Sequence, residues 1–194
     1  MSTKAIDRQP DKLDYASPTQ FKFGIHQLPK VEFFTVACNL PGINLGDAVF
    51  PTPFKDIPVM GDRLTYDNLT IEFIVDEYLE NWRSLHEWMT AIGFPKDRKQ
   101  FRDFRANKSN TPAATQGVSQ DIGDVQASTS ANALFSDAYL TILSNKNNPI
   151  LEVYFHNLYP VALGGLTYTQ QATDVEYMTV SATFQYQIYE ITAL

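Results

Sequence analysis

The chain has 194 residues, of which 44% are hydrophobic and 13% aromatic, and this composition excludes a globally disordered protein. Its formal net charge is -7 and its isoelectric point is about 4.9, which argues against a surface built to grip phosphates. The single cysteine, Cys38, excludes an intrachain disulfide. No apolar run approaches the roughly 20 residues that cross a bilayer, and the N-terminus lacks a secretory signal pattern. We therefore expect a cytoplasmic protein that makes no contact with a membrane.

Residues 1–18 form a predicted polar arm, and we place a single domain at residues 19–194. Apolar alternation predicts two strands over residues 21–26 and 31–36, joined as a hairpin. Residues 38–60 contain several prolines, which argue against a regular strand, so we interpret this stretch as a long loop. Its apolar side chains either fold back on the same chain or cover a neighbouring molecule. They are Leu40, Ile43, Leu45, Val49, Phe50 and Phe54.

Residues 69–75 read as a buried strand that leads into the one strong helix pattern of the chain. Asp76 and Glu77 suit a helix N-terminus, and this structural role explains them more simply than acid–base catalysis. The helix carries one apolar stripe with i, i+3 and i+4 spacing and ends at Gly93 and Pro95. The stripe consists of Leu79, Trp82, Leu85, Met89 and Ile92.

Residues 96–105 combine five basic side chains with Phe101 and Phe104. Such a mixture can bind phosphates and stack on bases, but the chain is acidic, so we favour contact with an acidic protein partner. Residues 107–134 are polar and contain few large apolar groups. We interpret them as an insertion that forms a long surface loop or is partly disordered.

The last third of the chain returns to a strand pattern. Residues 138–143 and 150–155 flank a turn-forming segment, 144–149, and the pattern breaks at residues 158–160. The final run, 178–189, alternates an apolar face with a polar, uncharged face. Long amphipathic strands with one helix predict a mainly β protein, an antiparallel β-sandwich or barrel with one flanking α-helix. The polar face consists of Thr179, Ser181, Thr183, Gln185 and Gln187.

No residue pattern indicates catalysis. The sequence contains no glycine-rich phosphate loop, no zinc-type Cys/His cluster and no nucleophile elbow. The three histidines, His26, His86 and His156, stand singly, and we interpret each as a surface or hydrogen-bonded residue. Asp62-Arg63 is better explained as a turn-stabilising or intersubunit ion pair than as a catalytic pair. We expect no enzyme activity, no cofactor and no metal.

Four segments resemble parts of the tail tube proteins of contractile-tailed bacteriophages and follow the family's order along the chain. The first leads from a Gly-Asp-Arg turn through a strand to an Asp-Glu pair. The second, Leu158-Tyr159-Pro160 with Gly164, is similar to the family's Gly-Leu-aromatic-Pro segment, although Asn157 stands where the family has glycine. The closing run and, more weakly, residues 40–43 also match. The residues of the first segment are Gly61, Asp62, Arg63, Asp67, Leu69, Thr70, Ile71, Asp76 and Glu77.

The resemblance implies a phage tail-tube fold, related to type VI secretion tubes, and an assembly of hexameric rings stacked into a hollow tube. Implied partners are further copies of the chain and the tail sheath, tape measure, tail terminator and baseplate proteins, with DNA only in transit. The implied location is the virion tail, assembled in the host cytoplasm. In this arrangement the apolar side chains of residues 38–60 and Asp62-Arg63 contact other subunits or rings. The polar face over residues 179–187 is one candidate for the wall of the lumen.

Other functions stay open at the level of sequence. The insertion and the N-terminal arm leave room for a baseplate tube initiator or a type VI-like tube subunit. A monomeric β domain that binds carbohydrate or nucleotide through Tyr159 and Tyr168 is a further alternative, and an enzyme is the last.

Overall fold

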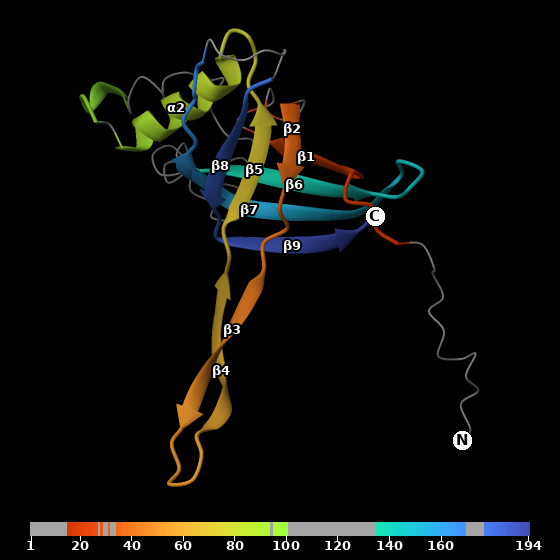
Figure 1. The fold of residues 1–194 in the computed structure, drawn as a ribbon, viewed down its shortest axis with the longest axis vertical. Helices are drawn as coiled ribbons and strands as arrows, with labels where there is room; N and C mark the ends of the chain where they lie inside the picture. Colours follow the sequence, from red (N-terminus) through yellow and green to blue (C-terminus); the bar gives the residue numbers. More distant parts are fainter. Residues whose placement is uncertain are drawn as a thin grey trace, which may run out of the picture.

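The structure is a computed structural model that describes residues 15–100 except 27, 29, 30, 32, 33 and 94, together with 135–169 and 177–194. The predicted N-terminal arm lies outside the described residues up to residue 14, and the predicted insertion at 107–134 lies outside them entirely. Figure 1 shows two crossed sheets, with a helix at one end of the long axis and a projecting hairpin at the other.

The strands of the crossed sheets pair antiparallel throughout the described part of the chain. One sheet has the order β1-β6-β7-β9, and the other has the order β7-β8-β5-β2, so that β7 belongs to both. The bounds are β1 Phe21–Ile25, β2 Thr35–Cys38, β5 Leu69–Ile74, β6 Ser136–Leu143, β7 Pro149–Leu163, β8 Thr179–Gln185 and β9 Ile188–Ala193.

Strand β7 passes from one sheet to the other at Asn157. Its first half pairs with β6 and β9, and its second half pairs with β8. Asn157 has a φ of 53°, in the left-handed region that glycine adopts freely and asparagine tolerates better than most residues. Asparagine is therefore suited to this position, for which the resemblance implies glycine. The predicted break at residues 158–160 is wrong, because β7 continues through Pro160 with a register shift that marks a bulge.

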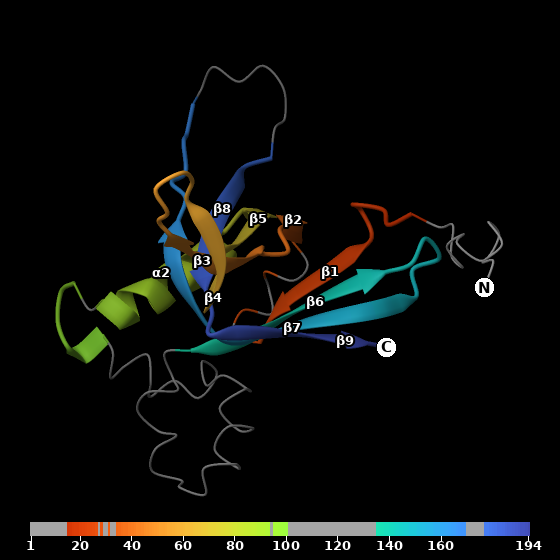
Figure 2. The same ribbon diagram turned by 90° about the horizontal axis from the view of Figure 1, so that it is seen from below.

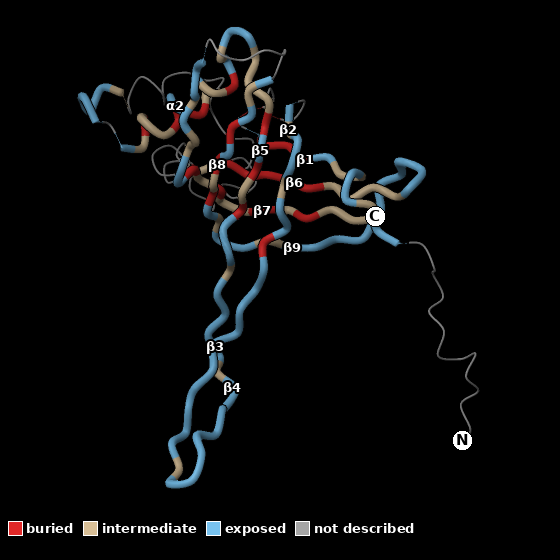
Figure 3. Tube along the Cα trace, viewed as in Figure 1, coloured by how far each residue is buried: buried red, intermediate tan, exposed pale blue. Residues whose placement is uncertain are grey.

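The core fills the space where the two sheets cross, as the buried segments in Figure 3 show. Buried residues alternate along β8 as predicted. They also alternate along β5, which the sequence predicts only as a buried strand, and β7 adds Val153 and Phe155. Helix α2, Glu80–Gly93, closes one end of this core (Figure 2) and places Trp88 with its ring centroid 6.3 Å from that of Phe184. The predicted antiparallel β-sandwich with one flanking helix is confirmed.

Helix α2 begins later than predicted. Asp76 and Glu77 lie in the segment before it, because Leu79 has a φ of 57°, which a right-handed helix does not contain. Asn81 Nδ2 donates to the Ile74 carbonyl at 2.8 Å at this entrance. The predicted apolar stripe is also displaced. Leu85 is buried as predicted, but the remaining buried positions are Asn81, Trp88 and Ala91, and Trp82 and Met89 lie at the half-buried border of that face.

Two further strand predictions need correction. The predicted hairpin over residues 21–36 does not form, because β1 pairs with β6 and β2 pairs with β5. Leu28 and Val31 are buried between them, so this segment carries the chain from one sheet to the other. The predicted closing strand is divided into β8 and β9, one in each sheet. Gln187 lies at the division, where its N–H donates to the His156 carbonyl at 3.0 Å.

The switch of β7 between sheets rests on Asp137, whose side chain is buried. Its carboxylate accepts hydrogen bonds from the Asn157 N–H at 2.9 Å and from the Tyr154 hydroxyl at 2.8 Å. We expect Asp137→Ala to lower the free energy of unfolding by about 2–4 kcal/mol, since a buried donor without a partner costs about 1–3 kcal/mol. Urea unfolding followed by circular dichroism measures the loss.

The matched control is Asn157→Gly, which keeps the left-handed backbone and the N–H bond to Asp137. It loses the exposed bond to Gln187 and should cost less than about 1 kcal/mol. An Asp137→Ala protein with the wild-type unfolding midpoint would show that the switch does not depend on this carboxylate.

Candidate assembly surface

The segment predicted as a loop over residues 38–60 is instead mostly a β-hairpin. Strand β3, Ile43–Phe50, pairs antiparallel with β4, Ile57–Tyr66, and the hairpin projects away from the two sheets (Figure 1). We call β3, β4 and their connection the arm. The prolines are compatible with these strands because both strands of a two-stranded sheet are edge strands, where proline is tolerated. Pro58 sits opposite Val49 in β4, and Pro51 and Pro53 lie in the connection.

A glycine contact divides the arm into two halves. The register passes from Leu45↔Leu64 to Asp47↔Met60, so β4 carries extra residues at this point. Such a bulge bends and twists a strand pair. Gly46 and Gly61 face each other there, and a Cβ on Gly61 would overlap the Gly46 carbonyl. Glycine at position 61 is therefore required for the close approach of the two backbones.

The arm exposes a large apolar surface. Every residue of β3 is exposed, and Figure 3 shows exposed residues along almost the whole arm. Phe54 at the tip is 98% exposed and Met60 is 84% exposed. A lone two-stranded hairpin is marginally stable in water, and an apolar patch of this kind marks an interaction surface. The exposed apolar residues of the arm are Ile43, Leu45, Val49, Phe50, Phe54, Ile57, Val59, Met60 and Leu64.

The predicted assembly residues thus come together on the arm, with two qualifications. Leu40 is exposed but lies just before β3, at the base of the arm. Asp62 and Arg63 lie within β4 rather than in a turn, and both are exposed. Because both residues lie in a strand, the interpretation as a turn-stabilising pair does not apply, and intersubunit contact stays a prediction. Sequence reasoning missed Ile57, Val59, Met60 and Leu64. For Ile57 and Val59 the available signal was their alternation around Pro58.

A cluster of aromatic rings fixes the base of the arm. Tyr66, the last residue of β4, makes edge contacts with Tyr186 and Tyr189 at centroid distances of 5.9 and 5.5 Å. Both tyrosines also contact the buried Phe155 of β7. The arm is therefore packed against the place where the chain changes sheets. We call Tyr66, Phe155, Tyr186 and Tyr189 the base cluster.

Hydrogen bonds connect the base cluster to the backbone at the foot of the arm. The Tyr186 hydroxyl donates to the Asp67 carbonyl at 2.9 Å, and the Tyr189 hydroxyl donates to the Pro41 carbonyl at 3.3 Å. Burial raises the pKa of the Tyr186 hydroxyl well above its usual range, with smaller contributions from Tyr189 and Asp67. The hydroxyl keeps its proton near neutral pH, so it remains a donor.

The predicted polar face lies on the outer side of the sheet formed by β7, β8, β5 and β2. Thr179, Ser181 and Gln185 are exposed on β8, and Thr183 is half-buried. Gln187 lies beyond β8, and its Oε1 accepts a hydrogen bond from Asn157 Nδ2 at 2.7 Å.

The neighbours of this face on β5 can be read from the register. Thr70 pairs with Thr183, and Glu72 pairs with Ser181. Because residues directly opposite each other share a face of the sheet, Glu72 is the charged group that joins β8 here. Among the described residues of β5 and β8, no lysine or arginine is present.

The remaining candidate residues make local contacts with neighbouring side chains. His86 stacks on Trp82, and His156 Nε2 lies 3.8 Å from a Glu190 carboxylate oxygen. The Tyr159 hydroxyl lies 2.7 Å from Gln185 Oε1, on the polar face. The described ranges contain no cluster of three or more metal-ligating side chains. None of the described helices is long and apolar enough to span a membrane.

Comparisons with known proteins give one family and one fold. The sequence profile of the family described as phage tail tube protein matches residues 10–192. No curated protein sequence matches the chain. A chain of the tube-terminating cap of the anti-feeding prophage aligns with a TM-score of 0.55 and 11% identity, covering 98% of this chain and 100% of that chain.

Two further solved structures share the fold. A chain of the anti-feeding prophage baseplate aligns with a TM-score of 0.54 and 8% identity, covering 93% of this chain and 97% of that chain. A chain of the sheath/tube terminator of an extracellular contractile injection system aligns with a TM-score of 0.53 and 10% identity, covering 94% and 100%.

The glycine contact predicts that Gly61→Ala displaces the arm without unfolding the sheets. The added Cβ would overlap the Gly46 carbonyl, so the two strands must separate at the bulge. We expect faster cleavage of the arm in limited proteolysis, with an unchanged thermal unfolding midpoint. Gly165→Ala is the matched control, since a Cβ at Gly165 meets no atom within 4 Å. Equal cleavage rates in the two variants would contradict the assigned role of Gly61.

Proposed function

The chain belongs to the phage tail tube protein family, and on that basis we propose that it forms hexameric rings that stack into the hollow inner tube of a contractile tail. The observation that carries this proposal is the arm. Its apolar side chains are exposed on a domain that already has a closed core. Such an arm is better explained as an interaction surface of a subunit that assembles with further copies of itself than as part of a monomeric binding domain.

We assign contacts between successive rings to the arm and contacts within a ring to open sheet edges. In the described part of the chain, β1 pairs only with β6, β2 only with β5 and β9 only with β7. Each of these strands leaves one side available for hydrogen bonding to another copy. Proteins with open edges either blunt them or pair them with another chain.

We assign the polar face of β8 to the wall of the tube's lumen. Phosphate affinity depends on lysine and arginine, and the strands β5 and β8 present only Glu72 as a charged group on this face. DNA in transit would therefore slide along hydroxyl and amide groups without being held. The proposed role is structural, with neither catalysis nor a cofactor.

Sheath, tape measure, terminator and baseplate proteins are the remaining proposed partners, and the proposed location is the virion tail after assembly in the host cytoplasm. A tube-initiating baseplate protein or a type VI-like tube subunit is the second candidate. This alternative is favoured by the fold shared with chains of a baseplate and of two tube ends in injection systems.

Electron microscopy of the purified protein tests the proposal, with rings or hollow tubes as the expected result. We expect the double variant Val49→Asp/Phe50→Asp to abolish tubes, because two buried carboxylates would disrupt an apolar interface. Its free energy of unfolding should stay within about 0.5 kcal/mol of wild type, since both residues are exposed in the monomer.

Tyr78→Asp is the control, since Tyr78 is also an exposed aromatic residue but lies outside the arm, in the turn before α2. Tubes of this variant should persist. A wild-type protein that stays monomeric at every concentration would contradict the tube proposal itself.

The lumen assignment predicts size-dependent labelling of Ser181→Cys, in a background in which Cys38 is replaced by serine. In the monomer, a small maleimide and a polymer-coupled maleimide should both react, because position 181 is exposed. In assembled tubes only the small reagent should react rapidly. Arg83→Cys, on the exposed side of α2, should react with both reagents in both states. Equal labelling of position 181 by the large reagent in tubes would place this face outside the lumen.

A further inference from the structure

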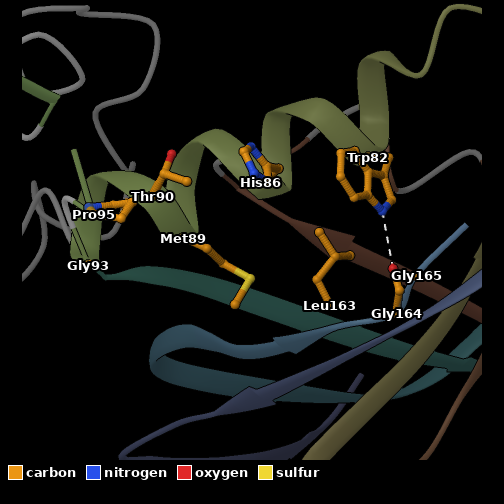
Figure 4. Close-up of a pocket in the computed structure, with 9 residues that line it drawn as sticks. All are labelled: Trp82, His86, Met89, Thr90, Gly93, Pro95, Leu163, Gly164 and Gly165. Atoms are coloured by element: carbon orange, nitrogen blue, oxygen red, sulfur yellow. Dashed lines mark hydrogen bonds between the residues drawn. The ribbon is translucent and has the colours of Figure 1, made fainter.

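An apolar groove lies between α2 and the C-terminal end of β7, with a volume of about 430 Å³. Figure 4 shows Met89 and Leu163 extending into this space from its two sides. Trp82 forms one end, where its Nε1 donates to the Gly164 carbonyl at 3.2 Å and its ring stacks on His86 at 5.3 Å. With the indole N–H satisfied, the groove offers aromatic and aliphatic surface, in the size range of about 300–1,000 Å³ typical of binding pockets.

Basic residues follow directly in the sequence after the last residue of the groove's α2 side. Pro95 is part of its lining, and Lys96, Arg98 and Lys99 come next, all of them exposed. Together with Asp97 they give this short segment a net positive charge in an acidic chain. We therefore expect the occupant of the groove to insert an apolar side chain and to carry acidic residues near it.

The arm of a second copy supplies the apolar contact and carries a slight acidic excess. Phe54 is 98% exposed at its tip and Phe50 is 60% exposed, and aromatic side chains of this kind are the usual anchors of an interface. The arm also carries three acidic residues against two basic ones. The acidic residues are Asp47, Asp56 and Asp62, and the basic residues are Lys55 and Arg63.

We propose that the groove beside α2 receives the tip of the arm of a second copy of this chain. The groove and the arm lie toward opposite ends of the long axis (Figure 1), so the contact joins the head of one subunit to the tail of the next. A contact between two different surfaces that does not close on itself propagates as a stack. The inference rests on the proposed tube function and names the surface on one ring that accepts the arm of the next.

The size of the arm suits a stable contact. A standard interface takes about 20–30 residues from each partner, and the arm supplies strands of 8 and 10 residues with the connection between them. The tip would occupy the groove, and the strands leading to it would cover the surface around it. Met89 has a flexible, polarisable side chain that adapts to an incoming aromatic ring.

A disulfide trap tests the pairing in assembled protein. Phe54→Cys and Met89→Cys are made separately in a Cys38→Ser background, mixed, assembled and oxidised. We expect a disulfide-linked dimer that contains one chain of each variant. Phe54→Cys mixed with Ile191→Cys is the matched control, because Ile191 is exposed on β9, and this mixture should stay uncrosslinked. If Phe54→Cys prevents assembly, Lys55→Cys takes its place with the same expectations.

The outcomes separate this inference from the proposed function. Tubes that form without a link between positions 54 and 89, or with a link between 54 and 191, would overturn the groove inference and leave the tube proposal standing. Wild-type protein that forms no tubes would overturn the tube proposal. The groove would be assigned to the same chain if two results occur together: the double variant Met89→Cys/Phe104→Cys forms an intrachain disulfide, and the mixture of Phe54→Cys and Met89→Cys forms no link.

A second variant tests the groove without cysteine chemistry. Met89→Trp fills the groove and should reduce tube formation strongly, with circular dichroism confirming that the monomer is folded. Glu87→Trp places the same side chain on an exposed part of α2 and should leave assembly unchanged. Normal tubes from folded Met89→Trp would contradict insertion of the arm tip into the groove.

Discussion

Strand β7 has to serve two crossed sheets with a single backbone, and the left-handed conformation of Asn157 makes this possible. Strands that change sheets at a bend form the corners of orthogonally packed sandwiches. The corner is held by Asp137, which bonds the Asn157 N–H, and by Gln187, which bonds the Asn157 side chain. Both sheets, and the core between them, depend on this one position.

The corner also sets the direction of the arm. The base cluster joins Tyr66 at the end of β4 to Phe155, just before the corner. Tyr186 and Tyr189 flank the point where the chain leaves β8 for β9. The arm is therefore attached to the most constrained part of the sandwich. An interaction element whose orientation is fixed before binding loses less entropy on assembly than one that must be ordered.

Sequence alone predicted the elements in which periodicity and burial agree. The inward alternation of β8 and the hairpin of β6 and β7 required no knowledge of distant contacts. The pairing of β1 and β2 could not be predicted, because it depends on Leu28 and Val31 crossing the core. The prolines of the arm favour a loop over a central strand, and the sequence alone does not show that both of its strands are edge strands, where proline is tolerated. The groove beside α2 combines residues far apart in the chain, such as Trp82 and Gly164, and no local pattern indicates it.

The prolines of the arm have a consequence for how this protein avoids aggregation. A long, exposed apolar hairpin with free edges is a template for indiscriminate strand addition and amyloid-like stacking. Pro58 removes one backbone donor from β4, Pro51 and Pro53 interrupt the tip, and the Gly46–Gly61 bulge twists the pair out of plane. A partner can then pack against the side chains of the arm, but a further strand can pair only poorly with its backbone. Polymerisation is thereby restricted to partners with a complementary surface.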